Sequence, residues 1–175
     1  MVIVGERINT SRKLIEPAVR ERNANFIKEQ VRRQREAGAN YIDLNCGTLV
    51  DNEAESLVWL VQIVQEEEEI PISLDSPNPE AIRSALAICK GKPLVNSITL
   101  EEKRFSSILP LLNQYGAAVV ALTMDDQGLP QTIDDRLRLA EKLVDGLTRA
   151  GVSIEDIYLD PLVRPASTDP QAALI

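Results

Sequence analysis

The chain has 175 residues, of which 44% are hydrophobic, 26% charged and 3% aromatic, and its formal net charge is −8. This composition is typical of a soluble globular domain with an aliphatic core, and no apolar run approaches the roughly 20 residues of a membrane span. The acidic charge and the lack of a basic cluster argue against nucleic acid as a partner. The start, MVIVGERINT, does not resemble a signal peptide, so we expect a cytoplasmic protein.

Strands and amphipathic helices alternate along the chain. Strands are predicted at residues 2–8, 40–46, 71–76, 93–98, 117–124 and 157–163. Apolar spacing of three and four predicts helices between them, at residues 17–37, 52–69, 79–90, 101–115 and 133–150. This repeated order indicates a parallel sheet built from right-handed βαβ units.

Local signals mark the helix ends. Asn78 before Pro79 predicts an N-cap, and Thr99 with Glu102 fits a capping box. Left-handed caps are expected at the glycines that follow the helices, namely Gly38, Gly91, Gly116 and Gly151. The acidic run at residues 66–69 is predicted to be a solvated face, because acid there opposes the helix dipole.

Two parallel architectures compete, a doubly wound open sheet and a (β/α)₈ barrel of the TIM type. GERINTSRK follows the first strand in place of GxGxxG, which weakens a dinucleotide-binding interpretation. A complete barrel takes about 250 residues. We therefore expect an incomplete α/β barrel with about six βα units. Residues 1–175 would form one domain, the N-terminal part of the barrel, without its closing strands.

The chain contains no histidine, which excludes Ser-His, Cys-His and His-metal schemes. Cys46 and Cys89 form neither a CxxC motif nor a metal-ligand spacing, and we expect them to be reduced thiols with packing roles. Any chemistry must therefore come from carboxylates, amides, hydroxyls, Lys or Arg.

Carboxylate and amide side chains stand at the carboxyl ends of the predicted strands. They are Glu6, Asn9, Asp43, Asn45, Asp75, Asn96 and Asp160. A single such residue is usually a cap or a loop residue. In an α/β barrel, however, these ends meet at one mouth. Burying unpaired polar groups costs a few kcal/mol each, so the set needs a partner.

The residue types narrow the choice of ligand. Carboxylates could hold Mg²⁺, but an amide among apolar neighbours makes a poor cage for a hard cation. Asp accepts hydrogen bonds, whereas Asn both donates and accepts. That pairing suits a planar, amide-like heterocycle. A Schiff-base aldolase is disfavoured, because Lys92 falls at the start of its strand.

A series of motifs resembles the methyltetrahydrofolate–corrinoid protein methyltransferases, pterin-binding α/β barrels related to the folate domain of cobalamin-dependent methionine synthase. The motifs are VGERIN at 4–9, IDLNCG at 42–47, LDS at 74–76, NS at 96–97, ALTMDDQGLP at 121–130 and YLDPLV at 158–163. Each is weak alone, but their order and spacing over essentially the whole chain are specific.

The resemblance implies that Asp75, Asn96 and Asp160 hydrogen-bond the pterin ring of tetrahydrofolate or methyltetrahydrofolate. Supporting roles in the same cleft fall to Asp43, Asn45, Glu6 and Asn9. The implied reaction of one-carbon metabolism moves a methyl group between N5 and the cobalt of a corrinoid (cobalamin) carried by a partner protein. No directly bound metal is expected, and the full-length protein is expected to be a homodimer. The family's N5-contacting Asn lies on the seventh strand, beyond Ile175, so no catalytic residue is assigned.

Three alternatives stay open. A dihydropteroate synthase-like enzyme is the nearest in chemistry, and a non-catalytic folate-binding module comes from another class. The third is a Mg²⁺-dependent barrel lyase that uses Asp43, Asp75 and Asp160.

Overall fold

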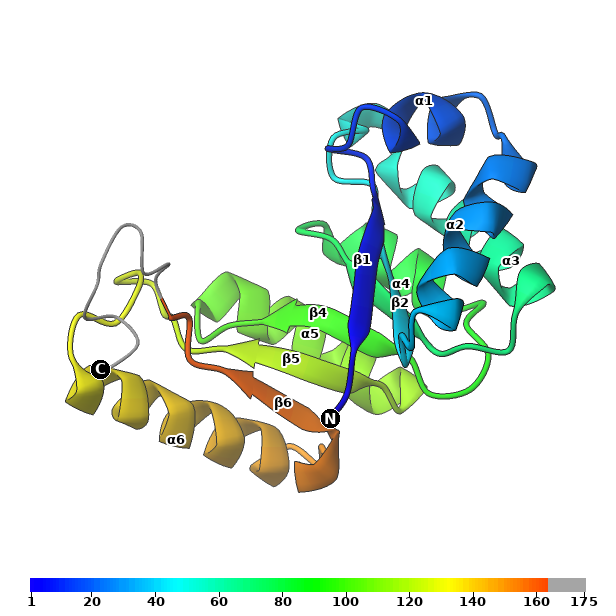
Figure 1. Ribbon diagram of the computed structural model, residues 1–175. Coiled ribbons are helices and arrows are strands. Elements are labelled where there is room, and N and C mark those ends of the chain that lie inside the picture. The colour runs from blue at the N-terminus through cyan, green and yellow to red at the C-terminus, as the bar shows by residue number, and fades with distance from the viewer. Residues whose placement is uncertain (164–175) are drawn as a thin grey trace. The chain divides into compact units, whose positions relative to one another are not determined.

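The structure is a computed structural model that describes residues 1–163 (Figure 1). Contacts divide the chain into two compact units, Met1–Asn96 and Ser97–Ile175. All assigned strand pairs within the units are parallel, and strands alternate with helices along the chain, as predicted. No helix among residues 1–163 is long and apolar enough to cross a membrane.

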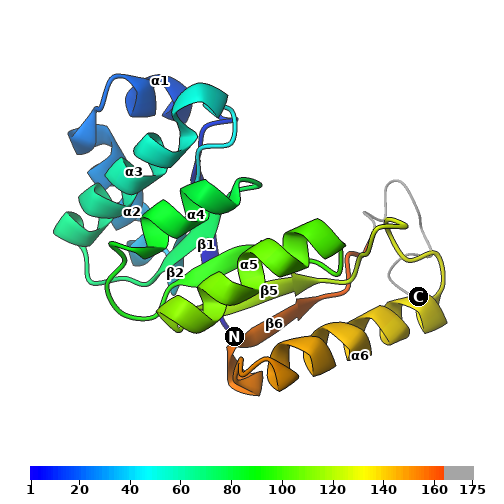
Figure 2. The same cartoon turned by 180° about the vertical axis from the view of Figure 1, so that it is seen from behind.

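The first unit pairs its strands in chain order. The strands are β1 (Val4–Asn9), β2 (Tyr41–Asn45), β3 (Ile72–Asp75) and β4 (Leu94–Ile98), whose last two residues belong to the second unit. The helices are α1 (Ile15–Arg20), α2 (Ala24–Glu36), the 3₁₀ turn η1 (Val50–Asn52), α3 (Glu53–Glu67) and α4 (Pro79–Leu86). Helices α2, α3 and α4 lie side by side (Figure 2) and pack against β1, β2 and β3 respectively.

Alternation along β2 explains which side chains enter the core. Ile42 and Leu44 are fully buried, whereas Asp43 and Asn45 point to the opposite face because successive side chains of a strand alternate. Ile72 and Leu74 repeat the pattern on β3, with Ser73 and Asp75 on the other face. The sheet of this unit therefore has one aliphatic face and one polar face.

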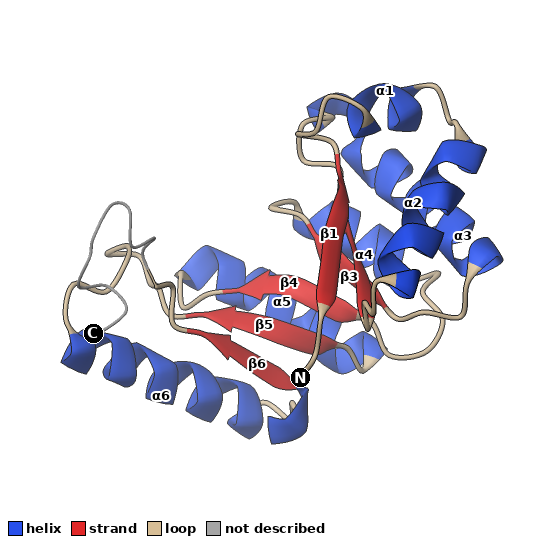
Figure 3. Cartoon of the chain, viewed as in Figure 1, coloured by secondary structure: helices blue, strands red, loops and turns tan. Residues whose placement is uncertain are grey.

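The second unit contains α5 (Glu102–Tyr115), β5 (Ala118–Leu122), α6 (Ile133–Arg149), the 3₁₀ turn η2 (Ile154–Asp156) and β6 (Ile157–Asp160). Strands β5 and β6 lie side by side in parallel (Figure 3), with Leu122 beside Asp160. Helix α6 turns Leu139, Leu143 and Leu147 into the core, a spacing of four that places them on one face of the helix.

Several predicted boundaries are confirmed. Asn78 caps α4 by accepting a hydrogen bond from the Glu80 N–H at 3.0 Å, with Pro79 in the first turn. Gly38, Gly116 and Gly151 have positive φ where α2, α5 and α6 end, as expected. Gly91 also has positive φ, but it caps no helix because α4 has already ended at Leu86. Cys46 and Cys89 are free thiols whose pKa burial raises to about 12, which fits packing roles.

Other boundaries were predicted wrongly. The helix expected at 17–37 is two helices, because Arg22 takes a left-handed φ of 54° and Asn23 then caps α2 through the Phe26 N–H. The helix expected at 79–90 ends at Leu86. No capping box forms before α5. Instead, the Thr99 hydroxyl donates a hydrogen bond to the Glu101 carboxylate and accepts one from the Glu101 N–H. The Glu102 N–H donates to Asp126 Oδ2 at 3.1 Å.

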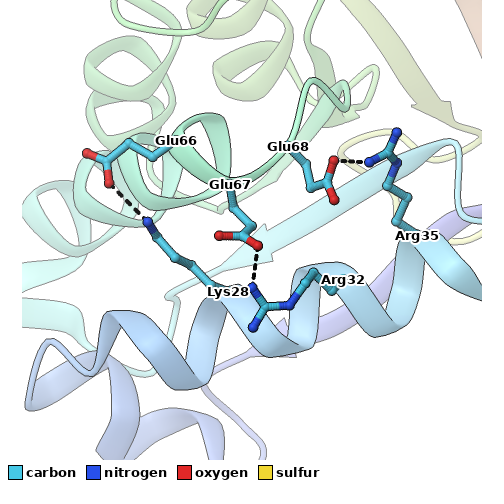
Figure 4. A network of polar contacts seen from close by, with 6 residues as sticks. All are labelled: Lys28, Arg32, Arg35, Glu66, Glu67 and Glu68. Carbon is cyan, nitrogen blue, oxygen red and sulfur yellow. Dashed lines mark hydrogen bonds and ion pairs between the residues drawn. The ribbon is translucent and has the colours of Figure 1, made fainter.

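The acidic run that ends α3 is not simply a solvated face, which corrects the prediction. Three of its carboxylates pair with basic residues of α2 (Figure 4), as Glu66–Lys28, Glu67–Arg32 and Glu68–Arg35. The side chains of Glu67 and Glu68 are only 17% and 18% exposed. Cations from α2 thus offset acid at the end of α3, where the helix dipole disfavours it.

Candidate functional site

Strand register aligns four polar side chains on neighbouring strands of the first unit. Asn9 is beside Asn45, Asn45 beside Asp75, and Asp75 beside Asn96. Partners at the same register point to the same face of a sheet. All four are half-buried and stand at or near the carboxyl ends of their strands. We call them the polar row. They carry three amides and one carboxylate.

The centre of the polar row is fixed by hydrogen bonds. Asn45 Nδ2 donates to Asp75 Oδ2 at 2.7 Å, and Asn45 Oδ1 accepts from the Gly47 N–H at 2.9 Å. The Asn45 amide is therefore held in one orientation, because its donor and acceptor both have partners. Oδ1 of Asp75 has no hydrogen bond from residues 1–163, so it can accept one from a ligand.

A β-bulge brings strand β1 into phase with the row. Gly5 pairs with Ile42 and Ile8 pairs with Leu44, so β1 advances by three residues over a stretch in which β2 advances by two. Residues three apart in a regular strand point to opposite faces. Because of the extra residue, Asn9 joins the polar row and Ile8 is buried against the other face.

Two glutamines of α2 hold this bulge. The Arg7 N–H donates to Gln34 Oε1 at 2.8 Å, and Arg7 Nε donates to Gln30 Oε1 at 2.7 Å. A Cβ at Gly5 would lie 2.7 Å from Gln34 Oε1, which explains why glycine occupies that position. The Gln34 amide thus replaces a ladder bond for the Arg7 N–H at the bulge, and Gln30 holds the Arg7 side chain.

Asp43 lies next to the row and is only 1% exposed. Ser73 Oγ donates to Asp43 Oδ1 at 2.7 Å. The pKa of Asp43 is raised to about 7, mainly by burial. The charges of Asp75 and Glu6 contribute to this rise, and hydrogen bonds from Ser73 and Asn96 oppose it. The Asp43 carboxyl is therefore partly protonated at neutral pH, and it can donate as well as accept a hydrogen bond.

The remaining predicted residues occupy distinct places. Glu6 is exposed and close enough to Asp43 to raise its pKa. Asn9 Oδ1 accepts from the Ser11 N–H at 2.9 Å, which leaves its amide N–H groups for a ligand. Asn96 flanks Asp75 and also contacts Asp43. The structure thus brings six of the seven predicted residues together within the first unit.

Asp160 belongs to the second unit, at the end of β6. Its Oδ1 accepts from the Leu162 N–H at 2.8 Å, and its backbone carbonyl accepts from the Thr123 N–H at 3.1 Å. Thr123 is fully buried, and its hydroxyl has no hydrogen-bond partner among residues 1–163. That Asp160 faces the same ligand as Asp75 and Asn96 stays a prediction.

Sequence reasoning did not identify the residues that orient the site, namely Ser73, Gln30, Gln34 and Gly47. A signal existed for Ser73, a hydroxyl inside the apolar run PISLDS. In residues 1–163, no three His, Cys, Asp or Glu side chains are grouped so that they could hold a metal ion.

Residues 5–175 match the family of pterin binding enzymes. The chain belongs to this family. The polar face of the first unit is therefore part of a pterin-binding enzyme domain, and the family prediction made from the motifs is confirmed.

Two relatives match this chain over different shares of their own length. The chain is 35% identical to the methylcorrinoid:tetrahydrofolate methyltransferase of Eubacterium limosum, over 97% of this chain and 63% of that enzyme. It is 28% identical to the methionine synthase of Mycobacterium leprae, over 96% of this chain and 14% of that protein. The chain thus spans less than two thirds of the length of either relative.

Solved structures share the fold at lower identity. Dihydropteroate synthase from Xanthomonas albilineans, in complex with 7,8-dihydropteroate, has a TM-score of 0.70 at 18% identity, over 97% of this chain and 63% of that one. The enzyme from Yersinia pestis has a TM-score of 0.72 at 16% identity, over 97% of this chain and 63% of that one. This likeness concerns the fold alone and confirms the predicted TIM-barrel class.

Proposed function

We propose that this protein binds tetrahydrofolate by its pterin ring, and that the whole protein transfers a methyl group between N5 of the folate and the cobalt of a corrinoid protein. The polar row is the observation that carries the proposal. Two further facts support it, membership of the pterin binding enzymes and 35% identity to a methyltransferase named for this reaction. That name also supports transfer from a methylcorrinoid to tetrahydrofolate as the direction.

Recognition of the ring follows from the hydrogen-bonding groups of the row. A reduced pterin presents amino and N–H donors along one edge and a carbonyl acceptor nearby. Asp75 Oδ1 would accept from the donors, because Asn45 already occupies Oδ2. The Asn96 amide would both donate and accept. We propose Asp160 as a further acceptor on the same ring.

The residues of this chain would bind and orient the folate, while the partner's corrinoid supplies or accepts the methyl group. Fixed amides and carboxylates stabilise charge that develops on the ring without having to reorganise during the reaction. Asp43 adds a proton that is available near neutral pH and lies next to Asn96. The site can thus stabilise charge that develops at N5, or provide a proton, without histidine.

The proposed reaction is tested by mixing the protein with tetrahydrofolate and methylcobalamin and following demethylation of the corrinoid by absorbance. Methyl transfer that depends on the protein and falls at least tenfold in Asp75→Ala is the expected result. Folate binding without any methyl transfer, in either direction, would instead favour a non-catalytic folate-binding module. Formation of dihydropteroate, in a separate assay supplied with 4-aminobenzoic acid and a dihydropterin pyrophosphate, would favour the dihydropteroate synthase alternative.

A further inference from the structure

A cavity of about 540 Å³ opens in the first unit, between the connection from α1 to α2 and the segment that follows β2. The residues that matter in its lining are Arg20, Arg22, Thr48, Leu49 and Ser56. We call it the Arg22 cavity. Its volume lies within the roughly 300–1,000 Å³ of small-molecule sites. None of the seven predicted site residues lines it.

Arg22 is held in this cavity in an unusual state. It has a φ of 54°, in the left-handed region that a non-glycine residue rarely adopts. Its guanidinium carbon lies 5.0 Å from the centre of the Trp59 ring, and Nη2 pairs with Glu55 at 3.1 Å. Nη1 is buried and has no acceptor among residues 1–163. An unpaired buried guanidinium nitrogen is costly, which points to an acceptor that binds there.

Other hydrogen-bonding groups line the same space. Ser56 is only 4% exposed, yet its hydroxyl forms no hydrogen bond with residues 1–163. Asn52, the N-cap residue of α3, makes no side-chain cap bond, so N–H groups of the first turn have no side-chain cap. Asp51 and Glu55 also line the cavity, but Glu55 is 77% exposed and already paired with Arg22. Ser56 is thus the buried hydrogen-bonding residue of the lining, and Arg22 is half-buried beside it.

We propose that the Arg22 cavity binds a carboxylate group, with Arg22 as the main ligand and Ser56 as a second donor. Guanidinium and hydroxyl groups together suit a planar oxyanion. The cavity begins at Thr48, three residues after Asn45, so these two Cα atoms are at most about 11 Å apart. A carboxylate at the end of a folate held by the polar row is one source, which rests on the proposed function. A separate small carboxylate is the other.

Calorimetry with three probes tests the proposal, namely tetrahydrofolate, a tetrahydropterin that lacks the aminobenzoylglutamate tail, and aminobenzoylglutamate alone. Two variants remove the donors. Arg22→Asn keeps a residue that tolerates positive φ, and Ser56→Ala leaves α3 intact because alanine favours helix. Arg33→Gln, which removes an exposed arginine paired with Glu29 within α2, is the matched control.

If the folate tail is the source, wild type binds tetrahydrofolate more tightly than the tetrahydropterin. Arg22→Asn then lowers the affinity for tetrahydrofolate by about tenfold to a hundredfold and leaves the affinity for the tetrahydropterin unchanged. If a separate carboxylate is the source, wild type binds tetrahydrofolate and the tetrahydropterin equally well, whereas aminobenzoylglutamate alone binds wild type and loses affinity in Arg22→Asn and Ser56→Ala. Unchanged binding of both carboxylate probes in both folded variants overturns the proposal. Failure of the proposed function looks different, because the tetrahydropterin would then not bind wild type.

Discussion

Asn45 joins two parts of the site through a single side chain. Its Nδ2 donates to Asp75 Oδ2 at 2.7 Å, while its Oδ1 accepts from the Gly47 N–H at 2.9 Å. The loop after β2 thereby fixes the carboxylate at the end of β3. Asn45 is thus a residue that positions Asp75, in addition to standing in the row itself.

Asn45→Ala is expected to weaken tetrahydrofolate binding by about 0.5–1.5 kcal/mol, because the substitution affects the ligand indirectly, through the orientation of Asp75. Asp75 would remain but would be less well oriented, so the loss should be smaller than in Asp75→Ala. Calorimetric titration measures both. Asn113→Ala, which removes an amide that bonds the Ala150 carbonyl in the second unit, serves as the control. Equal losses in Asn45→Ala and Asn113→Ala would contradict the positioning role.

Asp43 should make stability depend on pH. Its folded-state pKa of about 7 lies above the ordinary value of 3.8, so the native state binds more protons between these values than the unfolded state does. The unfolding free energy contributed by Asp43 therefore falls as pH rises through this window. Asp43→Asn removes this slope. Its unfolding free energy relative to that of wild type should therefore rise by about 2–3 kcal/mol from pH 5 to pH 8.

Urea unfolding of wild type and Asp43→Asn at pH 5 and pH 8 measures this difference. Asp145→Asn, which removes a carboxylate on the exposed side of α6, controls for the general change of charge. Parallel pH dependences in wild type and Asp43→Asn would show that the Asp43 carboxyl is not held protonated by burial.

The bulge in β1 should make Gly5 intolerant of any side chain. In Gly5→Ala, the new Cβ would meet Gln34 Oε1 at 2.7 Å, and that oxygen cannot move without releasing the Arg7 N–H. We expect a loss of about 1–3 kcal/mol in unfolding free energy, as for other overpacked sites. In a Gln34→Ala background, the same substitution should cost clearly less. Additive effects in this double-mutant cycle would exclude the clash as the cause.

The ion pairs between α2 and α3 should add modest, salt-dependent stability. Glu67→Gln breaks the contact with Arg32 and is expected to cost less than about 1 kcal/mol in dilute buffer. Most of that cost should vanish in about 1 M salt, where charges are screened within about 3 Å. Glu29→Gln, which breaks a pair within α2, is the matched control and should cost less. A cost for Glu67→Gln that does not change with salt would point to packing.

The sequence predicts the composition of the polar row because strand ends converge in a parallel α/β fold. Asn45, Asp75 and Asn96 each stand at the end of a short apolar run, so their place follows from the pattern alone. The faces to which the side chains of β1 point do not follow from the pattern, because a bulge adds one residue without altering residue types. Glu6 and Asn9 are three residues apart, and only the register shows how both come near Asp43 and Asn45.

Other features depend on contacts between elements and leave no local signal. The break at Arg22 falls inside a segment with continuous helical spacing, and it becomes apparent only where Arg22 meets Trp59 and Glu55. The sequence predicts a solvated acidic end for α3, and only the structure shows that Lys28, Arg32 and Arg35 of α2 pair with it. Long-range pairs of this kind are set by packing of the helices, which local residue patterns do not encode.

Pterin recognition by the polar row is tested most directly by calorimetric titration of tetrahydrofolate into wild type, Asp75→Ala and Asn96→Ala in metal-free buffer. Wild type should bind without added metal, and each substitution should weaken binding by about 1–3 kcal/mol, the range for loss of a buried hydrogen-bond partner. Binding that requires Mg²⁺, or affinity that neither substitution changes, would contradict it.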